Sequence, residues 1–178
     1  MKDYEALSKK HFDGQAADYD RRDTYYYSRN GKISCRDVAG QIKELPYESL
    51  LDVGCGTGFL MELLIKQRPA HYCGADLSDE MIRVAKEKRI DGAEFVVSSA
   101  DKLPYPDETF DIVTCSQSFH HYPYPDKAMA EALCALRADS TLCRELGRAA
   151  WERASRVFDF RKSAEELRAV YENGTDLL

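Results

Sequence analysis

The segment LLDVGCGTGF at residues 50–59 constrains the fold more than any other part of this chain. An apolar stretch runs directly into three alternating glycines, Gly54, Gly56 and Gly58. Because glycine has no Cβ, such a run lets the chain turn tightly from a strand into a helix, with room for a ligand against bare backbone at the helix amino terminus. A structural turn without a ligand is the simpler explanation of the same glycines. The pattern predicts a βαβ unit with a candidate ligand site in this turn.

Short apolar segments alternate with helical segments on both sides of the glycines, which is typical of a parallel sheet. The expected strands are residues 50–53, 71–75, 94–97 and 110–115, and the expected helices are 59–67, 79–88 and 126–136. Ser78 or Asp79 is expected to cap the second of these helices. The fold class is therefore α/β with a Rossmann-like sheet.

The last of these helices, 126–136, presents Met129, Leu133 and Leu136 on one side. After it the strand signal disappears, because no Ile follows Thr114 and Val occurs only at two later positions. We expect a sheet that is truncated after its fourth strand and a helical carboxyl-terminal extension over residues 137–178.

Helical patterns also precede the first strand. Residues 2–12 and 33–45 show helical periodicity, and Pro46 is expected to end the second helix. The aromatic and charged segment between them is interpreted as a short helix and a loop. We expect residues 1–45 to form a helical lid over a core of residues 46–136, within one domain of residues 1–136.

Charge and composition exclude several classes of function. The chain has 25 basic and 31 acidic residues, which gives a net charge of −6. It therefore lacks the positive electrostatic potential that attracts nucleic acid or anionic lipid. It also has no apolar run long enough to span a membrane and no secretory pattern at its start, which predicts a cytoplasmic protein. Its six cysteines form no CxxC pair, so we expect reduced, mostly buried thiols and no metal site.

Two carboxylates indicate what the glycine turn would bind. Phe59 occupies the position where a nicotinamide-binding turn has its third small residue, which argues against a dinucleotide. Asp52 would repel a pyrophosphate but would stabilise the ammonium group of S-adenosylmethionine. Asp76 ends the second strand, where a carboxylate accepts hydrogen bonds from both ribose hydroxyls of an adenosine. A helix-capping role is the alternative for Asp76, but Ser78 or Asp79 already provides that cap.

Polar residues follow the third and fourth strands as well. Ser99, Ala100 and Asp101 begin a loop that would close over the adenine ring and reach its amino group. Ser116 and Gln117 lie just past the fourth strand, outside the carboxyl ends of the sheet, where such folds bind ligands.

Three aromatic or histidine positions are candidates for the acceptor side of the site. His120 and His121 would contact the cofactor or the acceptor, with a general-base role for one of them, or else pack as loop-capping histidines. Tyr19 and the run at residues 25–27 would form an aromatic lid, stabilising a sulfonium by cation–π interaction, or simply pack the amino-terminal helices on the sheet.

Residues 12–134 resemble the ubiquinone and menaquinone biosynthesis C-methyltransferases, which are class I S-adenosylmethionine-dependent methyltransferases with a type 11 domain. The resemblance rests on FDGQAADYD (12–20), LLDVGCGTGF (50–59), GADLSDEMIRVAKEK (74–88), LPYPDETFDIVTCSQSFHH (103–121) and the following helix. It implies S-adenosylmethionine as cofactor, held by the glycine motif and by the acid after the second strand. The contacts that the resemblance implies are Asp52, Gly54, Gly56, Gly58 and Asp76, and the neighbouring Cys55, Leu77 and Met81 are further candidate cofactor contacts.

The chain departs from this family in two places. Ser98-Ser99-Ala100 replaces the usual Gly-Asp-Ala, so Ser99 stands where an Asp meets the adenine amine, and Asp101 is the expected substitute. The family also continues into a Pro-Gly-Gly turn and three further strands, which nothing after Leu136 resembles. Residues 138–174 instead resemble the carboxyl-terminal helices of family 4 glycosyltransferases, which pack the chain end and carry no chemistry.

These features support one main hypothesis and two alternatives. The main one is a methyltransferase acting on a small, neutral or apolar acceptor. A module that binds the cofactor without turnover is the second, and a truncated or fused remnant is the third. In the remnant, the terminal helices would cover the open edge of the fourth strand, or a homo-oligomer would pair that edge.

Overall fold

The computed structural model describes residues 4–21 and 26–136 of the 178-residue chain. The elements follow the order α1 (Tyr4–Asp13), η1 (Ala16–Asp18), α2 (Tyr26–Ile42), β1 (Ser49–Val53), α3 (Phe59–Leu64), β2 (His71–Asp76), α4 (Asp79–Glu87), β3 (Ala93–Val97), β4 (Ile112–Thr114), η2 (Phe119–His121) and α5 (Pro125–Ala135). The helical extension expected over 137–178 and its resemblance to glycosyltransferases lie outside the described residues. Within those residues, no helix is both long and apolar enough to cross a membrane.

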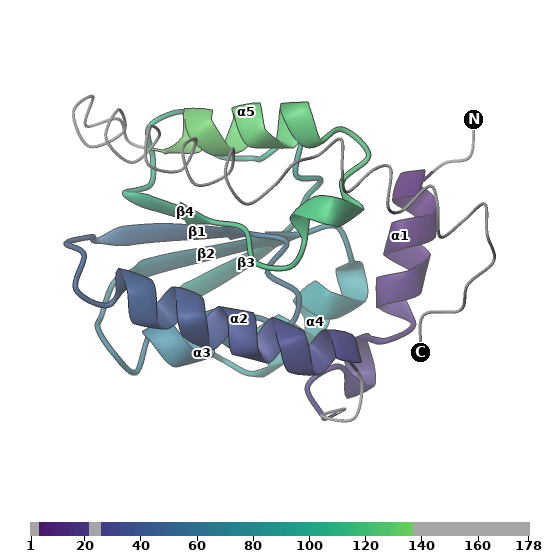
Figure 1. Cartoon of the computed structure of the whole chain (residues 1–178), viewed down its shortest axis with the longest axis horizontal. Helices are drawn as coiled ribbons and strands as arrows, with labels where there is room; N and C mark the ends of the chain where they lie inside the picture. The colour runs from purple at the N-terminus through teal and green to yellow at the C-terminus, as the bar shows by residue number, and fades with distance from the viewer. Residues whose placement is uncertain (1–3, 22–25, 137–178) are drawn as a thin grey trace, which may run out of the picture. The chain divides into compact units, whose positions relative to one another are not determined.

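The four strands form one parallel sheet in the order β3-β2-β1-β4 (Figure 1). Asp52 on β1 lies opposite Gly74 on β2 and opposite Thr114 on β4. Since all the strands run in the same direction, their carboxyl ends meet at one edge, where α/β sheets place their ligands. The predicted α/β, Rossmann-like fold is confirmed.

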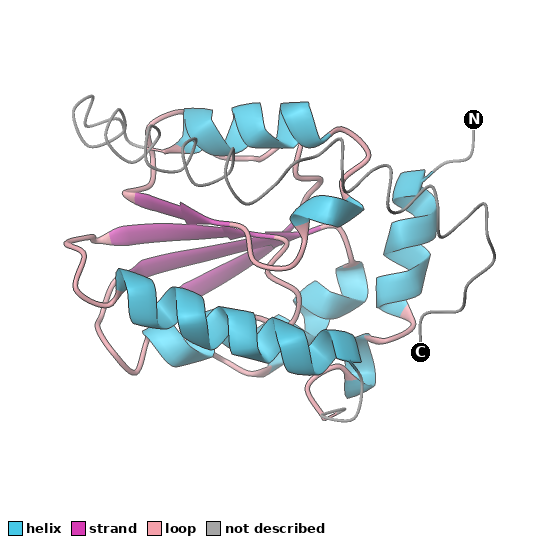
Figure 2. Cartoon of the chain, viewed as in Figure 1, coloured by secondary structure: helices cyan, strands magenta, loops and turns pink. Residues whose placement is uncertain are grey.

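Helices cover both faces of the sheet, as Figure 2 shows. Alternate residues of each strand point to opposite faces, so neighbouring leucines of β1 enter different cores. Leu50 packs with residues of α2, α3 and α4, whereas Leu51 packs with Phe110 and Ala135 of the α5 side. Both leucines are fully buried, so a slip of one residue in the pairing of β1 would exchange their two cores. Their burial therefore fixes the register of β1 and with it the residues that lie at its carboxyl end.

The second helix begins earlier than its periodicity predicts. It starts at Tyr26 rather than residue 33 and ends at Ile42, ahead of Pro46. The segment predicted as a short helix and a loop therefore contains η1 and, from Tyr26 onward, the first turns of α2. Burial of Ala39 and Ile42 against α3 and the sheet provides the tertiary packing that outweighs the weak local pattern.

The fourth strand is shorter than expected. Only Ile112–Thr114 pair with β1, and Phe110 forms an isolated parallel bridge with Leu136. The backbone N–H groups of Thr109 and Phe110 both donate to the Ala135 carbonyl, at 3.0 and 2.9 Å. Among the described residues no fifth strand pairs with β4, and the chain returns to its edge only at this bridge.

The apolar stripe expected on the last helix faces outward. Met129 and Leu133 are 47% and 62% exposed, whereas Ala128 and Ala135 are the buried residues of α5. The small side chains of the two alanines let the helix approach the sheet closely. Hydrophobicity alone does not predict that the alanines, rather than the larger apolar residues, are buried. The thiols were also expected to be mostly buried, but Cys115 and Cys134 are exposed.

Candidate functional site

The glycine turn after β1 is held against the neighbouring strand by its backbone. The N–H groups of Gly54 and Cys55 both donate to the Ala75 carbonyl of β2, at 2.7 and 3.1 Å. A Cβ on Gly54 would lie 2.3 Å from the Ser118 side chain, so only glycine fits there. A Cβ on Gly56 would meet nothing within 4 Å, which leaves this part of the turn open for a ligand. Both glycines have positive φ, which L side chains rarely adopt.

Asp76 links the end of β2 to the glycine turn. Its two carboxylate oxygens accept from the backbone N–H groups of Gly56, at 2.8 Å, and Ser78, at 2.9 Å. Burial raises the pKa of this carboxyl, and those two hydrogen bonds oppose the rise. A carboxylate offers about four acceptor positions, so two hydroxyls could still bind to it. The expected cap of α4 is Ser78, whose Oγ accepts from Met81 N at 3.1 Å.

Asp52 is a buried carboxyl group with a neutral partner. It is 3% exposed and accepts a hydrogen bond of 2.8 Å from the Thr114 hydroxyl of β4. Burial raises its pKa to about 7, and no cation pairs with it within the part of the chain that the structure describes. Such a group gains most from a positively charged ligand, because isolated buried charge is costly.

The loop after β3 brings two of the predicted adenine contacts together. The Ser99 hydroxyl donates to the carboxylate of Asp101, so the two side chains act as one polar unit. Ala100 lies between them and lines the same cleft. The substitution of Ser for the Asp expected here therefore still leaves a carboxylate at the start of this loop.

The segment after β4 closes the other side of the glycine turn. Ser118 Oγ and Tyr122 Oη both donate to the Val53 carbonyl, at 2.9 and 3.1 Å, and they fill the space that a side chain at Gly54 would need. Gln117 has a positive φ of 61°, and Ser116 Oγ donates to Ser34 Oγ of α2 at 2.9 Å. A non-glycine residue held in this conformation at the cleft is a common feature of functional sites.

The amino-terminal segment reaches the glycine turn through Asp20. Its Oδ1 accepts from the Thr57 hydroxyl at 2.7 Å, and its Oδ2 forms an ion pair of 2.6 Å with Lys88, a residue that is mostly buried. Tyr19 lines the cleft beside it, and its pKa is raised, first by burial and then by the negative charge of Asp76.

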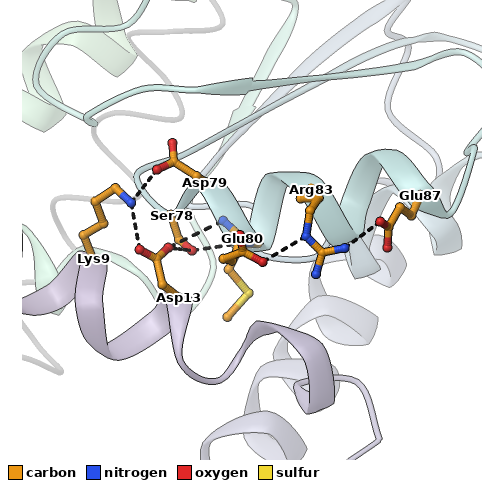
Figure 3. Close-up of polar contacts among 8 residues, drawn as sticks. Lys9, Asp13, Ser78, Asp79, Glu80, Arg83 and Glu87 are labelled. Carbon is orange, nitrogen blue, oxygen red and sulfur yellow. Dashed lines mark hydrogen bonds and ion pairs between the residues drawn. The ribbon is translucent and has the colours of Figure 1, made fainter.

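Helix α1 docks on the amino terminus of α4, as Figure 3 shows. Asp13 accepts from the Ser78 hydroxyl at 2.5 Å and pairs with Lys9 at 2.7 Å, and Lys9 also reaches Asp79 at 2.5 Å. A carboxylate beside a helix amino terminus is stabilised by the helix dipole. This group of contacts, the α1–α4 clasp, places α1 over the cleft.

The rings of the two histidines after β4 lie 3.9 Å apart, but only one of the two residues lines the cleft. His121 lines the cleft and meets Phe12 of α1 edge to face, with ring centroids 5.0 Å apart. Its pKa is lowered, chiefly by burial and also by His120 and His11, so the ring is neutral at pH 7. His120 does not line the cleft.

One cleft contains nearly all the residues that the sequence singled out. Twelve of the thirteen predicted cofactor contacts line it, together with Tyr19 and His121: Asp52, Gly54, Cys55, Gly56, Asp76, Leu77, Met81, Ser99, Ala100, Asp101, Ser116 and Gln117. Gly58 does not line it. A Cβ on Gly58 would lie 2.8 Å from Phe95, so its role is to let α3 begin close to β3. The side chains of the tyrosines at 25–27 lie outside what the structure describes.

Sequence reasoning missed several residues of this cleft. Asp20 and Thr57 flank Tyr19 and Gly56 in motifs that were already recognised, so their position alone was a usable signal. Phe12 begins the FDGQAADYD motif, so it also had such a signal. No sequence signal marked four other residues of α1 and α2, because these helices reach the cleft only through folding: Glu5, Ser8, Lys32 and Cys35.

The family model described as "Methyltransferase domain" matches residues 51–143. The ubiquinone/menaquinone biosynthesis C-methyltransferase UbiE of Brucella suis is 32% identical over 117 residues, covering 61% of this chain and 44% of the relative. The fatty-acid O-methyltransferase of Mycolicibacterium smegmatis is 40% identical over 90 residues, covering 49% of this chain and 33% of the relative. The solved structure of YcgJ from Bacillus subtilis aligns with a TM-score of 0.55 and 29% identity, covering 60% of this chain and 47% of that one. The chain therefore spans less than half the length of each of these proteins.

Proposed function

Because this chain belongs to the methyltransferase domain family, whose members use S-adenosylmethionine, we propose that it methylates a small, neutral or apolar acceptor. The observation that carries the proposal is the pair of carboxylates, Asp52 and Asp76, that border the glycine turn from adjacent strands. The cofactor supplies a methyl group on a positively charged sulfur, together with an ammonium and two ribose hydroxyls.

The residues present fit this cofactor. Asp52 is buried without a cation, so an ammonium group would complete its electrostatic environment. Asp76 retains acceptor positions for ribose hydroxyls beyond its two backbone partners. The open space at Gly56 provides backbone contact between these carboxylates, and the Ser99–Asp101 pair provides a carboxylate for the adenine amine.

The charge of the cleft favours a neutral acceptor. Its lining includes five carboxylates and one lysine: Glu5, Asp20, Asp52, Asp76, Asp101 and Lys32. This excess of negative charge would repel a carboxylate or phosphate on the acceptor while it stabilises a cationic cofactor. The aromatic rings of Phe12, Tyr19 and Tyr124 provide an apolar surface for the acceptor. The Brucella suis relative is named for ubiquinone and menaquinone biosynthesis, and a neutral aromatic acceptor would meet less repulsion in this cleft than the fatty acid for which the Mycolicibacterium smegmatis relative is named.

Methyl transfer needs alignment and exclusion of water more than acid–base chemistry. When bound between Asp52 and Asp76, the cofactor would supply an electrophilic methyl group and would keep the bonding electron pair on its sulfur. Helix α1, held by the α1–α4 clasp, would exclude water from this step. Where the acceptor must lose a proton, the neutral ring of His121 is the candidate base.

The experiment is a transfer assay on the full chain. Methyl-labelled S-adenosylmethionine is incubated with two matched panels, neutral phenols and quinols against fatty acids and phosphorylated phenols, and label transfer is measured together with S-adenosylhomocysteine. We expect transfer to neutral members only, and loss of transfer in Asp76→Ala. Cofactor binding with no transfer to any member would instead favour the non-catalytic binding module, and transfer mainly to carboxylates would contradict the charge argument.

A further inference from the structure

A second cluster of ligand-type side chains lies on the sheet away from the cleft. His71 and Cys73 belong to β2, and Glu94 belongs to β3, where it pairs in register with Cys73. Residues two apart on a strand share a face, so the imidazole and the thiol point to the same side. One donor atom from each of the three side chains lies within 4.8 Å of the other two.

The distances match those between the ligands of a tetrahedral zinc ion. His71 Nε2 lies 3.8 Å from Cys73 Sγ and 3.5 Å from Glu94 Oε1. With zinc bonds of about 2.0–2.1 Å to nitrogen and oxygen and about 2.3 Å to sulfur, tetrahedral angles require separations of about 3.6 Å and 3.3 Å. Both observed distances exceed these values by about 0.2 Å, an adjustment that two exposed side chains can make.

The chemistry and accessibility of the cluster also suit zinc. Imidazole, thiolate and carboxylate are the three protein ligand types of this ion. Cys73 is 1% exposed, whereas the His71 and Glu94 side chains are 53% and 74% exposed, so an ion could enter from solvent with water as its fourth ligand. The Tyr105 hydroxyl hydrogen-bonds to the Cys73 sulfur, which gives the thiolate the supporting contact that metal ligands usually have.

We propose that His71, Cys73 and Glu94 form a zinc site that ties the beginning of β2 to β3. On binding, the Cys73 thiol releases its proton to solvent, and no group is oxidised or reduced. His71 and Asp76 are the two ends of β2, so the zinc site and the cofactor cleft are separated by about 16 Å of strand. The site is therefore structural and independent of the methyltransferase proposal. A CxxC motif does not mark this zinc site, because its ligands come from two strands and include a single cysteine.

Cobalt titration of the full chain tests this site, because Co²⁺ reports a thiolate ligand by charge-transfer absorption and a tetrahedral geometry by its visible bands. We expect one equivalent of Co²⁺ to give both signals and an equivalent of Zn²⁺ to abolish them. In His71→Asn, Cys73→Ser and Glu94→Gln, Co²⁺ affinity should fall at least about tenfold. The control Cys134→Ser removes an exposed thiol on α5 and should bind like the wild type.

Two outcomes would overturn the proposal. One is a wild-type protein with no charge-transfer band at equimolar Co²⁺, and the other is a band that persists in Cys73→Ser or disappears in Cys134→Ser. His71→Asn is decisive if the buried Cys73→Ser fails to fold, because an exposed side chain at the end of a strand tolerates substitution. Binding of S-adenosylhomocysteine should be unchanged in all four variants, which separates this proposal from the one on the cleft.

Discussion

Two parts of the described sheet, the β1–β2 half and the β4–α5 half, differ in the length of their strand pairing and in the exposure of their apolar side chains. The β1–β2 half pairs over five residues, and its glycine turn is joined to Ala75 and Asp76 of β2 by hydrogen bonds of 2.7–3.1 Å. The β4–α5 half pairs over three residues and leaves Met129 and Leu133 exposed on its outer surface. The first half contains Asp52 and Asp76, the third proposed cofactor carboxylate, Asp101, follows β3, and the second half borders the expected acceptor side.

Because the two halves differ in this way, cofactor binding and methyl transfer to an acceptor depend on different parts of the sheet. The predicted cofactor contacts follow the ends of β1, β2, β3 and β4, and all of them lie within the described residues. An acceptor site also depends on the wall beside β4, where the described chain provides a single bridge between Phe110 and Leu136. Predictions about stability and affinity therefore concern the first half, and variants of α5 test the second.

The largest effect is expected at Asp52. Its pKa is raised from 3.8 to about 7 by burial, so the unfolded state loses this proton at lower pH than the folded state does. Stability contributed by the bound proton is complete below about pH 4 and is lost as the pH rises towards 7. Asp52→Asn removes this loss and should raise the free energy of unfolding at pH 7.5 by about 4 kcal/mol.

Urea titrations at about pH 4.5 and about pH 7.5 measure this difference, which should shrink to less than about 1 kcal/mol at the lower pH. Asp107→Asn, in an exposed turn, is the control and should show no such pH dependence. The same Asp52→Asn protein should bind S-adenosylmethionine more weakly than the wild type. An Asn variant that is less stable at pH 7.5 would show that Asp52 is not the unpaired buried carboxyl described above.

A smaller effect is expected in the α1–α4 clasp. Asp13→Asn removes the charge that Lys9 pairs with and weakens the hydrogen bond from Ser78. Since this side chain is partly exposed, the free energy of unfolding should fall by about 1 kcal/mol. Limited proteolysis should cleave the α1 region faster, while the far face of α4 stays protected.

Glu87→Gln is the matched control, because Glu87 pairs with Arg83 on the same helix but does not contact α1. Equal acceleration of cleavage near α1 in Asp13→Asn and Glu87→Gln would show that the α1–α4 clasp does not hold α1 in place.

The smallest effect is expected on the outer face of α5. Leu133 is 62% exposed, so Leu133→Lys should change the free energy of unfolding by no more than about 0.5 kcal/mol. Chemical denaturation and size-exclusion chromatography measure this. A large destabilisation or a change in oligomeric state would mean that another segment or a second copy covers this face of α5.

Local patterns predicted the βαβ elements because strands, glycine turns and caps depend on neighbouring residues. The strand before Gly54, the cap at Ser78 and the position of Asp76 are of this kind. The Asp20–Thr57 and Asp13–Ser78 contacts join residues 37 and 65 positions apart, and no local pattern records such a pairing. Helical periodicity placed Met129 and Leu133 on one face of α5 but does not say what covers that face, and both side chains are exposed.

The central claim is that Asp52 and Asp76 hold S-adenosylmethionine in the cleft beside the glycine turn. Isothermal titration calorimetry of S-adenosylhomocysteine and S-adenosylmethionine tests it on the wild type, Asp76→Ala and the exposed control Asp107→Ala. Loss of the carboxylate removes the ribose contacts and leaves the Gly56 and Ser78 N–H groups without an acceptor, so affinity should fall about 100-fold in Asp76→Ala alone. A folded wild-type protein that binds neither compound, or an Asp76→Ala variant that binds as tightly as the wild type, would contradict the account.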